Sequence, residues 1–303
     1  MARYSGPRIL TPPREEEEVY PYRRVWPSLI LEVSSIFGVT LILYVMVGFL
    51  GFNLPESLWQ PAGIVIALSP AVFWLLFERL PEQRVQQPRR QLTGVFVISM
   101  LVANAVGIPL LDSLNIEEWL TLEATFDRIL GYAATLGILQ ETLKYLVLRF
   151  LVWPDALRTR TDALAYAVAA AAGYATIVNL HVVFTQVSAP SPDVTALRVF
   201  STTMLHFSAS AVTAFGLAQL RFNARSIALP LSMLAASLLA GFAITFRSGL
   251  VSGGFALGIA GTRPLFGLVF SLILIVAVLI SIAFLFNAAE RQSREALAST
   301  EEA

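Results

Sequence analysis

The chain has 303 residues, of which 56% are hydrophobic and 14% are charged, and its mean hydropathy is +0.69. Soluble domains carry about 25% charged residues, so this composition indicates an integral membrane protein that is surrounded by a lipid bilayer. The formal net charge is zero, which gives no indication of a nucleic-acid partner. The sequence contains no cysteine, which excludes disulfides and thiolate nucleophiles, and it has two histidines, His181 and His206.

The N-terminal residues 1–27 include PPREEEEVYPYRR, a stretch rich in proline and charge that lacks the apolar core of a signal peptide. This composition predicts a flexible tail. The C-terminal residues 289–303 end in EALASTEEA and predict a second tail.

Eight apolar segments separate these tails, and each is long enough to cross a bilayer as a helix of about 20 residues. They cover residues 28–52, 58–79, 92–111, 125–150, 163–187, 194–221, 226–246 and 265–288. The pattern predicts an all-α polytopic membrane protein with one transmembrane domain over residues 28–288.

Basic residues alternate with the predicted spans, which indicates the orientation. The loops after the first, third and fifth spans contain no lysine or arginine. Arginines instead gather in the two tails and in the second, fourth and sixth loops: Arg3, Arg8, Arg14, Arg23, Arg24, Arg84, Arg89, Arg90, Arg158, Arg160, Arg221, Arg225, Arg291 and Arg294. The positive-inside rule therefore places both termini in the cytoplasm and the chain in the cytoplasmic membrane.

The fourth span contains the sequence Gln140-Glu141-Thr142-Leu143-Lys144 among large apolar residues. Ionisable groups in hydrocarbon cost several kcal/mol unless they are paired or hydrated, so each needs a reason. Lys144 is near enough to the helix end to reach the interface, whereas Glu141 lies about 15 Å into the span. One interpretation is an ion pair that holds helices together; the other is a functional site.

The fifth and sixth spans add further polar side chains, at Asn179, His181, Arg198, His206 and Ser210. Hydrogen bonds between helices explain such residues without any catalytic role. The small-residue run AYAVAAAAGYA at 165–175 indicates that the fifth span packs closely against its neighbours.

The order of these residues resembles that of the PrsW-type intramembrane proteases, relatives of the CAAX-processing glutamate proteases. The resemblance covers residues 125–246. Residues 140–144 match a Glu-Glu-x-x-Lys motif, and Arg198 and His206 match an arginine followed eight positions later by a histidine. Between them lie further matching residues, which are Asp162, Gly173, Tyr174 and Asn179.

Three positions depart from the family pattern: Gln140 and Val178 stand where it has glutamate, and Ala240 where it has histidine. The resemblance implies that such groups activate water, either directly or through a bound metal. The resemblance thus implies Glu141 and His206 as catalytic residues, with a supporting set of Gln140, Lys144, Asn179, Arg198 and Ser210. The metal candidates are Glu141, His206 and His181, but Val178 and Ala240 argue against a zinc ion.

The sequence leads to two main hypotheses about function, which belong to different functional classes. The favoured hypothesis is a non-catalytic or strongly divergent relative that binds transmembrane partners, because three carboxylate or imidazole groups are lost. The alternative is an active intramembrane peptidase that uses Glu141 and His206 to hydrolyse membrane-anchored substrates. A transporter is a lesser alternative, since the prolines in the spans could break helices, although no paired halves are evident.

Overall fold

The computed structural model describes residues 24–52, 54–85, 87–115, 120, 124–186, 189–223, 225–252 and 264–301. Every regular element within these ranges is a helix, which confirms the all-α class. Most of the tail predicted at residues 1–27 lies outside the described residues, because these begin at residue 24.

The first four helical segments each contain a short π-helical turn. Along the chain these segments comprise α1 (Val25–Leu43), η1 (Tyr44–Phe49), η2 (Glu56–Leu58), α2 (Trp59–Ala67), α3 (Ser69–Trp74), η3 (Leu75–Arg79), α4 (Leu80–Glu82), α5 (Leu92–Val102), η4 (Ala103–Gly107), α6 (Ile108–Leu114), α8 (Thr125–Tyr132), η5 (Ala133–Gly137) and α9 (Ile138–Leu151). Two of the π turns, η3 and η4, end two residues before Pro81 and Pro109. A proline clashes with the carbonyl four residues earlier, and the wider π turn relieves that clash.

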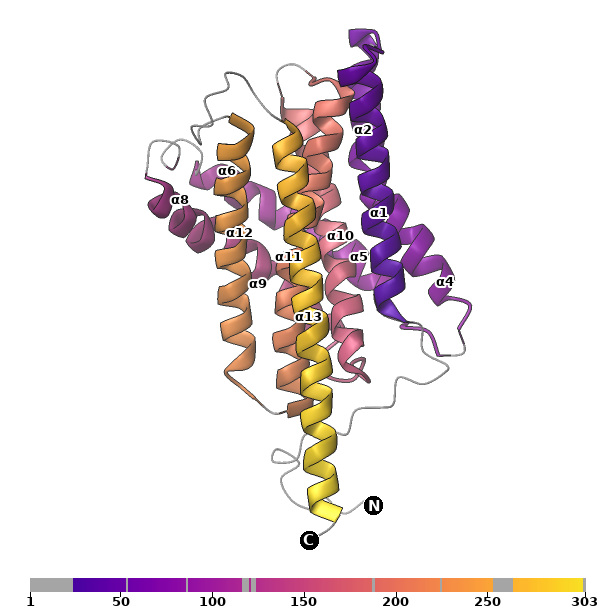
Figure 1. Cartoon of the computed structure of the whole chain (residues 1–303), viewed down its shortest axis with the longest axis vertical. Helices are drawn as coiled ribbons and strands as arrows, with labels where there is room; N and C mark the ends of the chain where they lie inside the picture. The colour runs from indigo at the N-terminus through magenta and orange to yellow at the C-terminus, as the bar shows by residue number, and fades with distance from the viewer. Residues whose placement is uncertain are drawn as a thin grey trace.

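The last four helices run without such interruptions. They are α10 (Arg160–Thr185), α11 (Pro192–Asn223), α12 (Ala228–Ser252) and α13 (Pro264–Glu301). In Figure 1, α1 begins and α13 ends toward the same end of the bundle. The last helix continues through residues 289–301, which the sequence predicted as a tail.

Among the described residues, six helical segments are long and apolar enough to cross a membrane: Val25–Phe49, Glu56–Glu82, Leu92–Leu114, Arg160–Thr185, Ala228–Ser248 and Leu265–Gln292. The chain is therefore a multi-pass membrane protein. The two other predicted segments, 125–150 and 194–221, are helical in the structure but more polar. Eight crossings and two cytoplasmic termini stay predictions.

Helix α10 occupies the centre of the bundle. It packs against α11 and α5, while α11 packs in turn against α12 and α13. Ala169, Ala170, Ala171 and Ala172 are fully buried, as is Tyr174. Small side chains let neighbouring backbones approach closely, and this approach replaces the hydrophobic driving force that lipid cannot supply.

Gly173 marks one of these close approaches. A Cβ atom at this position would lie 2.3 Å from the backbone oxygen of Phe96 on α5. Because a backbone atom cannot move out of the way as a side chain can, α5 and α10 would have to separate to admit even a methyl group.

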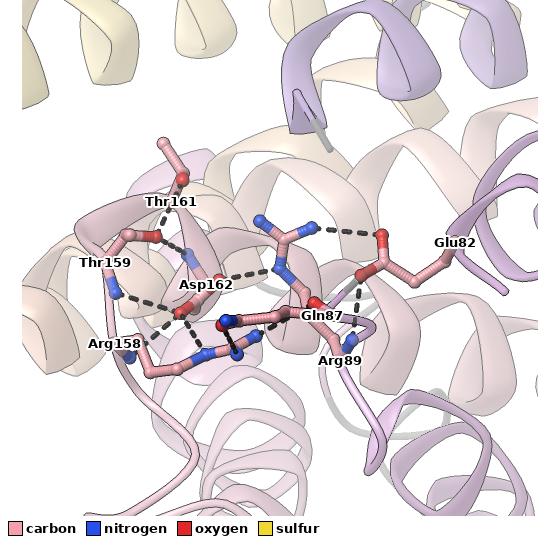
Figure 2. Close-up of polar contacts among 7 residues, drawn as sticks. All are labelled: Glu82, Gln87, Arg89, Arg158, Thr159, Thr161 and Asp162. Carbon is pink, nitrogen blue, oxygen red and sulfur yellow. Dashed lines mark hydrogen bonds and ion pairs between the residues drawn. The ribbon is translucent and has the colours of Figure 1, made fainter. Parts of the chain in front are cut away.

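A buried ionic network fixes the start of α10 to the loop between α4 and α5 (Figure 2). Arg89 donates through Nε to Asp162 Oδ1 at 2.6 Å, and through Nη1 to Glu82 Oε2 at 3.1 Å. The second oxygen of Asp162 accepts backbone N–H groups from Arg158 and Thr159, each at 2.9 Å. Asp162 therefore closes the capping box of α10 and binds Arg89 at the same time.

Within this network Arg89 pairs with two carboxylates, and the Arg158 guanidinium lies 4.0 Å from Asp162 Oδ2. Burial lowers the pKa of Arg89, but the Asp162 and Glu82 carboxylates outweigh this effect and raise it above its usual value. The guanidinium therefore stays charged at any physiological pH. Arg89 is 2% exposed and Asp162 is fully buried, so each partner depends on the other for compensation.

We predict that Gly173→Ala destabilises the protein by about 1–3 kcal/mol, because the added methyl overpacks the contact with Phe96. Gly38→Ala is the matched control, since a Cβ there meets nothing within 4 Å. That control should be neutral or stabilising by up to about 1 kcal/mol. Unfolding in mixed detergent micelles measures both, and equal effects would contradict the close packing of α5 and α10.

We predict that Arg89→Leu destabilises the protein by about 3–5 kcal/mol, because it removes the buried guanidinium that pairs with both Glu82 and Asp162. The neighbouring Arg90 is exposed, and Arg90→Leu should change stability by less than about 0.5 kcal/mol. The same unfolding titration compares the two variants. A small effect at residue 89 would show that the network does not hold α10 in place.

Candidate functional site

Helix α9 carries Glu141 and Lys144 on one face, one turn apart, and both are 2% exposed. The π turn η5 precedes this helix and ends at Gly137. A Cβ at Gly137 would lie 2.8 Å from the backbone oxygen of Ser237. The entry to α9 is therefore pressed against α12, which sets the position of the two charged side chains.

The Lys144 ammonium is the centre of the site. It donates to Glu141 Oε1 on its own helix and to Ser210 Oγ on α11, the latter at 2.7 Å. It also lies 3.4 Å from Nδ1 of His206. An ammonium that faces Nδ1 favours the neutral imidazole tautomer with its proton on Nε2.

Thr213 completes the shell around Glu141. Its hydroxyl donates to Glu141 Oε2 at 3.0 Å, so each carboxylate oxygen accepts a hydrogen bond from the protein. The sequence analysis did not identify Thr213. The sequence feature that could have identified Thr213 is its spacing from His206 and Ser210, because residues at i, i+4 and i+7 lie on one face of α11.

Tyr174 of α10 covers the site from a third helix. Its ring centroid lies 5.3 Å from that of His206 and 5.9 Å from the Lys144 ammonium. Its buried hydroxyl has no hydrogen-bond partner among the described residues. A Cβ at Gly107 would lie 2.2 Å from that hydroxyl, so the glycine makes room for the tyrosine.

The structure thus brings Glu141, Lys144, His206 and Ser210 together. We call these four residues, with Thr213 and Tyr174, the Lys144 cluster. Gln140 is also buried on α9, but the hydrogen bonds described above do not include it. The catalytic role of Glu141 and His206 stays a prediction.

The other predicted residues lie elsewhere. Asn179 donates to Thr203 Oγ1 at 3.3 Å, one turn before His206 on α11. Arg198 lines a hollow between the end of α10 and the start of α11, together with Asn179 and Gln186. His181 lies 3.5 Å from Asp112 Oδ1 on α6 and is 30% exposed.

Two of the three positions that depart from the family pattern lie in apolar surroundings. Val178 packs against a cluster with Leu143 and Tyr174. Ala240 is buried with Leu205 and Ala243. Neither position offers a proton acceptor or a ligand.

These residues do not fit a catalytic metal site. Such a site normally has three protein ligands and one open position. No group of three histidine, cysteine, aspartate or glutamate side chains lies close enough together to hold a metal in the part of the chain that the structure describes. Within the Lys144 cluster a lysine ammonium, rather than a metal, compensates the charge of Glu141.

The family model described as PrsW family intramembrane metalloprotease matches residues 87–280. This chain belongs to the PrsW family. The match begins earlier than the predicted region of 125–246 and includes Arg89, which binds the family-matching Asp162. It also extends into α13. Searches of curated proteins and of solved structures found no match.

We predict that Lys144→Met destabilises this PrsW-family protein by about 3–5 kcal/mol, because it leaves the buried Glu141 carboxylate uncompensated. Adding Glu141→Gln should restore part of the loss, since the pair is then replaced by two neutral side chains. Equilibrium unfolding measures the double-mutant cycle.

Arg225→Met serves as control for this cycle. Arg225 is exposed, so its replacement should shift stability by less than about 0.5 kcal/mol. Additive effects of the two substitutions in the Lys144 cluster would contradict a coupled buried pair.

Proposed function

We propose that this PrsW-family protein no longer hydrolyses peptide bonds and uses its membrane fold to bind the transmembrane segment of another protein. The observation that carries the proposal is the hydrogen bonding of Glu141 within the Lys144 cluster. Both oxygens of Glu141 accept hydrogen bonds from buried side chains of the protein, Lys144 and Thr213.

This bonding makes Glu141 a poor general base. A base that activates water must reach that water and take its proton. Here the Lys144 ammonium and the Thr213 hydroxyl already bind the two carboxylate oxygens, so a water molecule would have to compete with them for the base. The losses at Gln140, Val178 and Ala240 remove the groups that could share the task.

The hollow between α10 and α11 supports binding of a helix end. Apolar side chains such as Val182 and Val194 line its walls, and Gln186 and Arg198 add polar donors. The last four carbonyl groups of a helix have no partner within that helix. A transmembrane segment that ends at this hollow would place such carbonyls near an amide and a guanidinium.

A second candidate, hydrolysis, is favoured by two contacts of Lys144. Lys144 Nζ lies 2.7 Å from Ser210 Oγ and 3.4 Å from His206 Nδ1. A hydroxyl, an amine and an imidazole in such proximity form part of the constellations that activate nucleophiles. This grouping keeps peptidase activity as the alternative to be tested.

Incubation of the purified protein with membrane-anchored reporters in proteoliposomes tests the choice. We predict that wild type cleaves no more reporter than Glu141→Ala or His206→Ala, because the cluster lacks a free base. Cleavage by wild type that either substitution abolishes would overturn the proposal.

Binding is tested separately. A photo-crosslinking residue at Val194, beside the hollow, should capture single-span reporter proteins, and Arg198→Gln should reduce the yield. Ile280 on α13 is 66% exposed and is the matched position for non-specific capture. Equal yields at the two positions would contradict a binding site between α10 and α11.

A further inference from the structure

A second group of buried polar atoms lies where α1 meets α3 and η3. Ser28 and Glu32 are one turn apart on α1, and Trp74 ends α3; all three are fully buried. Ser28 Oγ, both Glu32 carboxyl oxygens and Trp74 Nε1 have no hydrogen-bond partner among the described residues. Buried polar groups are nearly always hydrogen-bonded, so four such atoms together need a partner that the described residues do not supply.

The packing places these atoms at one interface. Helix α1 packs against both α3 and η3. Leu29 and Val33, which directly follow Ser28 and Glu32, belong to the same apolar cluster as Trp74. Glu78 follows Trp74 by four residues and is close enough to Glu32 for their charges to interact.

The nearby cation is shared among other carboxylates. Arg89 binds Glu82 and Asp162 directly, and Glu78 also acts on it electrostatically. Glu78 is therefore close enough to interact electrostatically with both Glu32 and Arg89. With both Glu32 and Glu78 ionised, two buried carboxylates would repel each other at a site where Arg89 already compensates two more.

We propose that Ser28, Glu32, Trp74 and Glu78 form an internal hydrated site that binds one proton, with water bridging the two carboxyl groups. The proton comes from bulk water and resides on Glu32, while Glu78 keeps its charge beside Arg89. This site lies outside the Lys144 cluster and does not depend on the proposed function.

The donor and acceptor pattern selects water over a metal cation. The Trp74 indole can only donate a hydrogen bond, and a cation would repel that N–H group. A water molecule can accept from the indole and donate to a carboxylate at the same time. Buried waters typically make about three hydrogen bonds to such unsatisfied polar groups.

Infrared difference spectroscopy of the purified protein in detergent tests the proposal. The carbonyl stretch of a protonated carboxylic acid should be present in wild type at neutral pH, although exposed glutamates ionise at about pH 4.3. Glu32→Gln should remove this band, and Glu82→Gln should leave it, because Glu82 is ion-paired with Arg89. The pH titration of the band uses the wild-type protein alone, so a variant that fails to fold does not affect this result.

Hydration is read from the position of the band. Trp74→Phe and Ser28→Ala should shift its frequency without removing it, because each deletes a partner of the bridging water. Replacing sodium with a bulky organic cation should leave the band unchanged.

Three results would overturn the proposal. They are a wild-type protein without the band at neutral pH, a band that survives Glu32→Gln, and a band that sodium removes. A frequency that neither Trp74→Phe nor Ser28→Ala alters would exclude the bridging water.

Discussion

The buried ammonium of Lys144 is the constraint on which the site depends. It is bound by Glu141 from the same helix and by Ser210 from α11, and it faces His206. A charge in a low-dielectric interior is tolerated only when it is paired and hydrogen-bonded. The register between α9 and α11 is therefore fixed by the need to deliver these partners to one nitrogen atom. Thr213 supports the same register from the other oxygen of Glu141.

Close backbone packing makes this arrangement possible. The small residues of α10 let α5 approach Gly173, and Gly107 leaves space for the Tyr174 hydroxyl that overlies the site. The Arg89 network then fixes the start of α10 through its capping box. Charged groups thus hold the bundle together in two places, within the Lys144 cluster and at the start of α10.

Membership of the PrsW family and the chemistry of this chain point in different directions. The family model is described as a metalloprotease, yet the cluster compensates Glu141 with an ammonium. Val178 and Ala240 sit in apolar clusters where the family pattern has a carboxylate and an imidazole. A fold can keep its packing while the polar groups of its centre change, since function depends on the site rather than on the fold. The non-hydrolytic proposal follows from that separation.

The sequence by itself determined the helical membrane class, the family resemblance and the grouping of Glu141 with His206. Hydropathy reports the membrane class because a bilayer forces each span to satisfy its own backbone hydrogen bonds, whereas the resemblance to the PrsW family implied the grouping of Glu141 with His206. The sequence did not show which side chains pair with one another across helices. The residues that flank Thr213, Arg89 and Glu32 in the sequence do not indicate which side chain of another segment each one will contact. The π turns also change the angular register of the helices that carry Glu78 and Glu141. Only the tertiary structure decided that Lys144 lies between the acid and the imidazole, because that position depends on how closely α9, α10 and α11 pack.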